Sequence, residues 1–337
     1  PLSQIAKTHK PINYSPILCA HTLRFPSSIS SPFSSSLSLL PYFIPPQTKR
    51  TFPYLIASYK SIKMAPNLQL GPSQASPSEI AMFNLLKANL EFPAGSTVKA
   101  KKLVDDMIFI YTSTEDSPYC SWQLWPMVVA LAACIPPDHE WQTSLVEALH
   151  LVRQLDDSVA KDDSGHPFNK LPDLLMTITE YWHGFHNIFT IEDSDPLVPG
   201  QLEQLVRWKS VNSFLARVTT DDYVELLNSG IDQVAIALEL EPAKQEPVAA
   251  CYIWVATEWI THCGSIIFKL LQGKSKISYD LKGTGSLCKD IPPQSTQRWE
   301  FWKERLVEFK GDTLITSRIQ ETIKAMNEIQ SNEQQEE

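Results

Sequence analysis

The segment from Glu246 to Gln272 restricts the fold of this chain more than any other stretch of its sequence. One row of apolar or aromatic side chains recurs there every three or four residues: Tyr252, Ala256, Trp259, Cys263, Ile266 and Leu270. Val255, Ile260 and Ile267 widen this row over much of the circumference of a helix. Such a helix must be covered by other elements on several sides. The segment therefore predicts the central helix of a helical bundle.

The helical period continues through most of the chain from Ser76 onward. Ser76, Pro77 and Glu79 form a capping box with proline at the first helical position, which opens a helix to about Leu90. Further helices are expected at about 98–111, 125–133, 138–155, 172–189, 200–217, 221–240, 296–310 and 313–330. No segment of useful length alternates with the period of a strand. We predict an all-α fold, a single multi-helix bundle or short helical array of about nine or ten helices.

Charge divides the chain into two parts. The first 63 residues contain seven Lys or Arg and no Asp or Glu, so the net charge of −9 for the whole chain leaves −16 for residues 64–337. An acidic body of this kind repels phosphate backbones and anionic lipid surfaces. We therefore expect neither nucleic acid nor a membrane as a partner.

The same asymmetry suggests the domain boundaries. Residues 1–75 are expected to be a disordered or over-extended leader with the true start at Met64, residues 76–330 the helical domain, and residues 331–337 a polar tail. The leader is acid-free and Ser-rich like a transit peptide, although its prolines interrupt any amphipathic helix. The expected compartment is the cytoplasm, with the nucleus as an alternative, and a mitochondrion only if residues 1–63 are a genuine transit segment.

The cysteines indicate a reducing environment. None of the six belongs to a C-x-x-C pair, and Cys120, Cys134, Cys251 and Cys263 lie in or beside apolar helical patterns. These positions favour buried thiols over a disulfide framework or a zinc site. No apolar run reaches membrane-spanning length, since prolines at both ends stop "PMVVALAACIPP".

Three tryptophan-containing stretches carry a resemblance to a known family. "RWKSVNSFLARVT", "TEWITHCG" and "STQRWEFWKERL" follow "SWQLWPMVVALA" in that order. Together they resemble a fungal domain family of unknown function over roughly residues 94–326, a length that suits one domain. The matching positions are Trp208, Asn212, Phe214, Arg217, Thr219, Trp259, Gly264, Trp299, Trp302, Lys303 and Arg305. Ser210 and Leu215 depart from the pattern, and the resemblance implies an all-helical fold with no established activity.

Asn212 is a polar residue inside the apolar arc of its expected helix. At 100° per residue from Trp208 it falls at about 40°, on the same side as Leu215. An unpaired buried amide costs about 1–3 kcal/mol, so its oxygen and N–H groups should bond to a facing helix. The alternative is that Asn212 forms the polar floor of a ligand pocket.

Two other polar side chains allow both a structural and a functional interpretation. Arg217 lies off the apolar arc, and either an internal ion pair with Asp221 or Asp222 or a ligand carboxylate would suit its guanidinium. Glu258 and His262 are four residues apart on the central helix and can pair. His262 is then either a core histidine whose ring nitrogens have hydrogen-bond partners or a general base.

All nine tryptophans lie between Trp122 and Trp302. The pairs Trp122/Trp125 and Trp299/Trp302 are three residues apart and should share a helix face, which favours core packing. A tryptophan-lined ligand slot is the alternative. The candidate binding or structural polar network is therefore Trp208, Asn212, Arg217, Trp259, His262, Trp299, Trp302 and Arg305.

The sequence contains no complete catalytic or metal-binding motif. His183 and His186, with Glu180, do not specify enough ligands for a metal. Asp105-Asp106 and Asp156-Asp157 lack the third acid of the aspartate motif with which helical terpene-forming enzymes hold magnesium. There is no Gly-x-Ser-x-Gly and no phosphate-binding glycine loop. We expect no catalytic residue, no metal and no cofactor.

These observations leave two function classes. The first is a non-enzymatic interaction or scaffold protein that binds another protein through a helical groove, with a Gly- and Pro-containing loop expected at 273–296. The second is a small-molecule binder or enzyme with a Trp-lined pocket between helices. The second requires Asn212, His262 and at least one Trp to converge on one concave site.

Overall fold

Ten α-helices make up most of the part of the chain that the structure describes. The computed structural model describes residues 66–70, 75–113, 121–162, 165–189, 197–275, 281, 283–309, 311 and 313–335, with the backbone alone at 121 and 183–189. In order, the helices are α1 (Pro77–Glu91), α2 (Ser96–Tyr111), α3 (Leu124–Cys134), α4 (Glu140–Arg153), α5 (Leu174–Phe189), α6 (Pro199–Val218), α7 (Leu227–Leu238), α8 (Glu246–Leu271), α9 (Thr296–Glu308) and α10 (Thr313–Gln335). The β structure in these residues amounts to two isolated bridges. The predicted all-α fold is confirmed.

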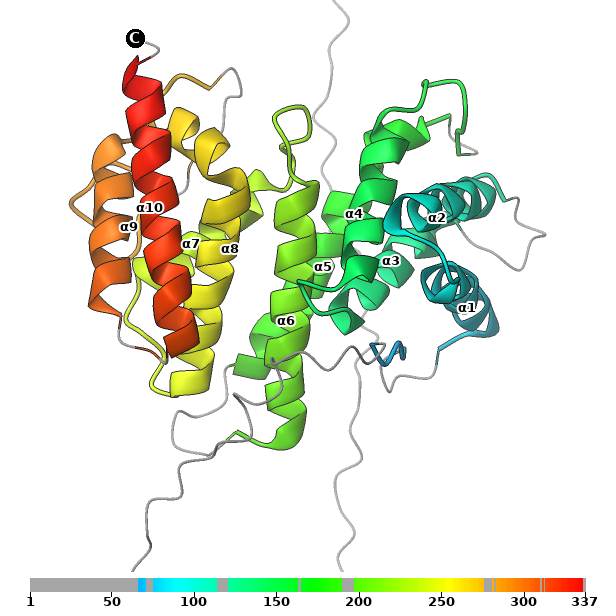
Figure 1. Ribbon diagram of the computed structural model, residues 1–337, viewed down its shortest axis with the longest axis horizontal. Helices are drawn as coiled ribbons and strands as arrows, with labels where there is room; N and C mark the ends of the chain where they lie inside the picture. The colour runs from blue at the N-terminus through cyan, green and yellow to red at the C-terminus, as the bar shows by residue number, and fades with distance from the viewer. Residues whose placement is uncertain are drawn as a thin grey trace, which may run out of the picture. The chain divides into compact units, whose positions relative to one another are not determined.

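The α8 helix lies among four other helices. It packs against α6, α7, α9 and α10 (Figure 1). Because these neighbours cover several of its sides, Trp259, Ile260 and Ile267 have no exposed surface. The prediction of a central helix at this position is confirmed.

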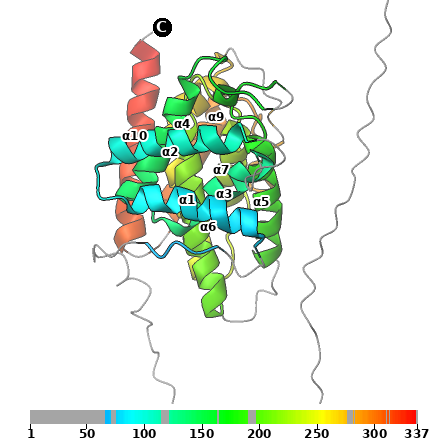
Figure 2. The ribbon, with the colours of Figure 1, turned by 90° about the vertical axis from the view of Figure 1, so that its right-hand side faces the viewer.

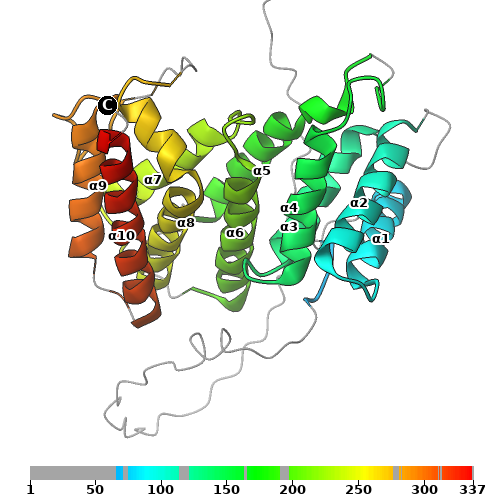
Figure 3. The same ribbon diagram turned by 45° about the horizontal axis from the view of Figure 1, so that its top comes forward.

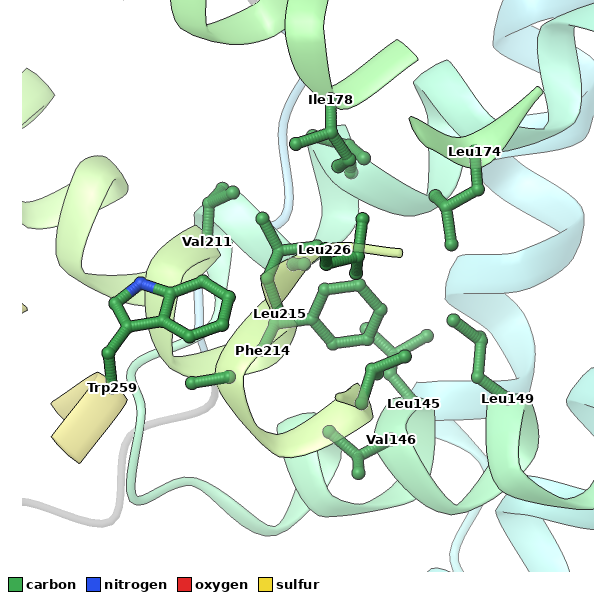
Figure 4. Packing of buried hydrophobic residues seen from close by; sticks show 14 of the residues in the cluster. Leu145, Val146, Leu149, Leu174, Ile178, Val211, Phe214, Leu215, Leu226 and Trp259 are labelled. Carbon is green, nitrogen blue, oxygen red and sulfur yellow. The ribbon is translucent and has the colours of Figure 1, made fainter. Parts of the chain in front are cut away.

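The α6 helix joins α8 to the N-terminal helices. It packs against α3 and α4 as well as α8 (Figure 3). Figure 4 shows Phe214 of α6 among side chains that include Leu145 and Val146 of α4, with Trp259 of α8 on another side. Every residue from 210 to 216 is buried, so a one-sided apolar arc is the wrong description of this half of α6. Helices on several sides leave this stretch without a solvent-facing stripe.

The N-terminal helices form their own layer. Helix α2 packs on α4, and α1 packs on α2 and α3 (Figure 2). The ring of Phe168 stacks on Tyr111 at 4.5 Å and on Trp125 at 5.6 Å. Trp122 is 68% exposed, so the prediction that Trp122 and Trp125 share a buried face is wrong. The reason is that Trp122 lies in a short 3₁₀ turn (Ser121–Gln123) before α3 begins.

Two helix boundaries differ from the predicted ones. Helix α7 begins at Leu227 rather than near 221, because the backbones of Thr220 and Tyr223 bond to each other twice at 3.0 Å in a tight turn. Helix α10 continues to Gln335 rather than ending near 330. Its last turn is held by an ion pair of 3.3 Å between Lys269 of α8 and the buried Glu333.

Several sequence expectations concern thiols, membranes and the leader. Cys251 and Cys263 are buried free thiols, and Cys134 is half-buried. None of the helices in the described ranges combines the length and the apolar character needed to cross a bilayer. Residues 1–65, and with them most of the expected leader, lie outside the described residues, as does Cys120. Within the leader's last part, Leu68 is buried and packs in the core.

Candidate functional site

Helices α6 and α8 run side by side in the same direction. Four contacts join the two helices, and residues later in α6 contact residues later in α8. They are Leu205 with Cys251 (3.6 Å), Asn212 with Trp259 (2.9 Å), Ser213 with Glu258 (2.6 Å) and Ala216 with Cys263 (3.3 Å). Because the sequence separation between the contacting residues stays nearly constant, the two helices are parallel. Residues one turn apart on α6 therefore meet residues one turn apart on α8.

Asn212 is completely buried in this interface. Its amide nitrogen donates to the carbonyl oxygen of Trp208 at 3.0 Å, and its amide oxygen accepts from the indole of Trp259 at 2.9 Å. The expected partner on a facing helix is Trp259 for the amide oxygen, whereas the amide nitrogen bonds within α6 instead. The bond gives the amide oxygen of Asn212 and the indole N–H of Trp259 a partner away from water.

Glu258 is a buried carboxylate on the same interface. Its side chain accepts from Ser213 of α6, pairs with Arg318 of α10, and lies 3.3 Å from His262 one turn along α8. The predicted pairing with His262 is confirmed. Burial raises the pKa of a carboxyl group, but here hydrogen bonds from His262 and Ser213 and the charge of Arg318 outweigh it and hold the pKa of Glu258 at about 2. Glu258 is therefore ionised at neutral pH and is a weak base.

Three residue pairs with the same sequence separation line this contact, and we call them the α6–α8 seam. They are Lys209 with Trp254, Ser213 with Glu258, and Arg217 with His262. The first pair is a cation–π contact of 5.7 Å and the second a hydrogen bond of 2.6 Å. Arg217 and His262 occupy the next turn of the same register. Arg318 of α10 joins the seam, with its guanidinium 4.3 Å from the centre of the Trp254 ring and its Nε bonded to Thr257 at 2.6 Å.

The guanidinium of Arg217 turns toward α4. It donates to three neutral acceptors, the carbonyl oxygen of Pro137 (3.3 Å), Oε1 of Gln142 (3.2 Å) and Oγ1 of Thr143 (2.9 Å). The predicted ion pair with Asp221 or Asp222 is wrong, and Asp222 pairs instead with Arg153 at 3.7 Å. A helical side chain leans toward the N-terminus of its own helix, whereas both aspartates lie beyond the C-terminus of α6. Burial lowers the pKa of Arg217.

A second buried carboxylate closes the C-terminal end of α7. Glu239 has no exposed surface and accepts two bonds from Arg298 (2.6 and 3.1 Å), one from the indole of Trp302 (2.7 Å) and one from the amide of Gly285 (2.8 Å). A Cβ atom at Gly285 would lie 2.5 Å from the carbonyl oxygen of Glu239, so the loop can come this close only with glycine. These bonds tie the loop expected at 273–296 to α7 and α9.

The structure distributes the eight predicted site residues over three places. Trp208, Asn212 and Trp259 lie in the α6–α8 core, Arg217 and His262 in the seam, and Trp299, Trp302 and Arg305 on α9. The four tryptophans have no exposed surface, so they do not line an open pocket. Arg305 donates to the carbonyl oxygen of Leu238 at 3.1 Å. A shallow depression of about 440 Å³ lies elsewhere, on α10 side chains between Gln320 and Asn332.

The remaining predicted chemistry has little support in the described residues. The side chains of His183 and His186 lie outside them. Asp156 and Asp157 are exposed, and hydrogen bonds within their own loop lower the pKa of both carboxyls. No group of three or more described His, Cys, Asp or Glu side chains could hold a metal ion. Burial raises the pKa of Cys251 and Cys263 to about 12, which keeps these thiols protonated.

Sequence reasoning did not identify four residues of the seam region. Arg318 had a usable signal, because it sits beside the apolar row of Ile315 and Ile319 on α10, as Asn212 does on α6. The sequence gives no comparable signal for Lys209, Ser213 and Trp254. They meet only because α6 and α8 pack in parallel.

Comparisons with known proteins identify the family. No curated protein and no solved structure matches the chain. A family model described as "Protein of unknown function (DUF3632)" matches residues 125–306, more than half of the 337 residues. The match contains all eight predicted site residues and the buried carboxylates of Glu239 and Glu258, whereas Arg318 lies beyond it. The chain belongs to the DUF3632 family of proteins of unknown function.

Proposed function

We propose that this chain is a non-enzymatic interaction protein that acts in the cytoplasm and binds another protein through the surface of its helices. The seam carries the proposal, because charged and aromatic side chains of three helices gather there beside an ionised carboxylate. His262 is 36% exposed and Arg318 is 26% exposed, so both are accessible from solvent. A cytoplasmic location suits the free thiols Cys251 and Cys263.

The chemistry of the described side chains favours binding over catalysis. General bases work best with a pKa near the working pH, whereas the pKa of Glu258 is about 2. The buried thiols are protonated, and the Ser213 hydroxyl donates its proton to a carboxylate instead of to a histidine. The predicted tryptophans are enclosed, so a ligand slot between them has no support from their exposure.

Site-specific photo-crosslinking tests this proposal. A benzophenone amino acid is placed at Thr261 or Ser265, which are exposed on α8 near His262, and at Lys324 on α10 as a control. Irradiation of extracts should give a discrete adduct from Thr261 or Ser265 and none from Lys324. Absence of adducts at all three positions would contradict the proposal. If a metabolite then raised the melting temperature, the small-molecule alternative would replace it.

A further inference from the structure

The seam carries an excess of positive charge on an acidic domain. Lys209, Arg217 and Arg318 contribute three positive charges, and Glu258 and Asp138 contribute two negative charges, which leaves +1 over these five groups. Residues 64–337 as a whole carry −16, so this patch has the opposite sign to the rest. Asp138 and Glu258 are the acidic groups whose charge acts on Arg217. The contacts that Arg217 makes to α4 and to Pro137 before it are all to neutral acceptors.

The cations are spaced along the seam at intervals set by the helix. Lys209 and Arg217 are eight residues apart on α6, which is about 12 Å at 1.5 Å per residue. Between them lies the turn of Ser213 and Glu258, where Arg318 enters from α10. The four residues from Lys209 to the turn of Ser213 rise by about 6 Å. Carboxylates placed at every fourth residue of a partner helix recur at the same interval of about 6 Å.

Trp254 provides a contact for the apolar part of such a partner. Its ring lies 4.3 Å from the guanidinium of Arg318 and 5.7 Å from the ammonium of Lys209. The side chain is half-buried, so one part packs in the protein and another part reaches the surface. An indole flanked by cations suits a partner that presents carboxylates next to apolar side chains.

We propose that the seam binds an acidic helical segment of a partner protein, with its carboxylates against Lys209 and Arg318. Charge complementarity and the common spacing of about 6 Å select this partner. A long phosphate backbone fits less well, because the −16 of the surrounding domain repels it. The inference rests on the proposed interaction role and adds the chemistry of the partner and the residues that bind it.

Binding of a defined peptide to the full chain tests the inference. The probe is a fluorescein-labelled helical peptide with Glu at every fourth position, compared with the same peptide carrying Gln instead. We expect the Glu peptide to bind, and to bind less tightly as salt rises. Lys209→Glu and Ser265→Glu should each weaken binding about five- to tenfold. Lys209→Gln should weaken it less, and Lys324→Glu on α10 should change it less than about twofold.

Each outcome decides between the two proposals. Equal binding of the Gln peptide, or equal loss from Lys324→Glu, would show that the seam is not an acidic-peptide site. Tighter binding of a ten-nucleotide oligo-dT would overturn the inference in favour of nucleic acid. If the Glu peptide fails to bind while Ser265 still forms its adduct, the partner chemistry is wrong and the interaction role stands. If both fail, both proposals are rejected.

Discussion

Glu239 and Glu258 are both buried carboxylates paired with arginine, but their surroundings differ. Arg298, the partner of Glu239, is 2% exposed, and indole and backbone N–H groups complete the set of donors. Arg318, the partner of Glu258, is 26% exposed, and His262 beside it is 36% exposed. The first cluster is enclosed on all sides, whereas the second has an edge at the surface.

The difference separates a structural ion pair from one with binding capacity. At Glu239 every donor points inward, so the cluster can only hold α7, α9 and the loop before α9 together. At Glu258 the carboxylate binds Arg318 and His262, and the outer sides of both side chains remain accessible. Burial and hydrogen-bond completeness, rather than the presence of an Arg–Glu pair, distinguish the two roles.

The largest effect is expected at the enclosed cluster. Glu239→Ala leaves the charge of Arg298 and the indole N–H of Trp302 buried without their acceptor. The free energy of unfolding should fall by about 3–5 kcal/mol in urea denaturation. Glu308→Ala removes the exposed partner of Arg305 and should cost less than about 1 kcal/mol. Similar small losses for both variants would erase the distinction between the clusters.

The second-largest effect on the free energy of unfolding is expected when acid protonates Glu258. Its pKa in the folded protein is about 2, below its ordinary value of 4.5, so the unfolded chain binds the proton more readily. The stabilisation is complete above pH 4.5 and is lost as the pH falls toward 2. It is worth on the order of 3 kcal/mol. The difference in unfolding free energy between wild type and Glu258→Gln should therefore shrink over this window, and a constant difference would contradict the low pKa.

Asn212 provides an uncharged buried contact for comparison. Asn212→Ala removes the acceptor of the Trp259 indole and should lower the free energy of unfolding by about 1–3 kcal/mol. Asn327→Ala, on the exposed side of α10, is the matched control and should stay within about 0.5 kcal/mol. Equal melting temperatures for the two variants would mean that the buried amide does not stabilise the α6–α8 interface.

His262 should give the smallest effect. Its side chain is 36% exposed, and the buried Glu258 keeps its bonds to Ser213 and Arg318 when the imidazole is removed. His262→Ala should lower the free energy of unfolding by less than about 1 kcal/mol at pH 7. A loss comparable to that of Glu239→Ala would place the Glu258 cluster among the enclosed, structural ones.

Helical periodicity was sufficient to predict most of the architecture. The central position of α8 could be predicted because most of its turns carry apolar side chains on more than one side. The start of α7 was not, since the Thr220–Tyr223 turn depends on backbone bonds that helical spacing does not reveal. Trp122 was misplaced because a spacing of three residues implies a shared face only inside a helix.

The candidate site was less predictable than the fold. Asn212 could be identified as polar within an apolar arc, and its need for a partner followed from the cost of an unpaired amide. Its partner, Trp259, is 47 residues away, and the pairing depends on how α6 meets α8. Arg217 contacts α4 rather than the aspartates that follow it in sequence, because side-chain direction depends on the helix that carries it.

The sequence by itself therefore determined the helical class, the central helix and the residues that need partners, because periodicity and polarity are local properties. Only the tertiary structure decided that Lys209 lies beside Trp254 and Ser213 beside Glu258. It also decided which of the two carboxylates is enclosed. The physical reason is that helix packing direction and solvent access depend on contacts between residues far apart in the chain, which no local pattern records.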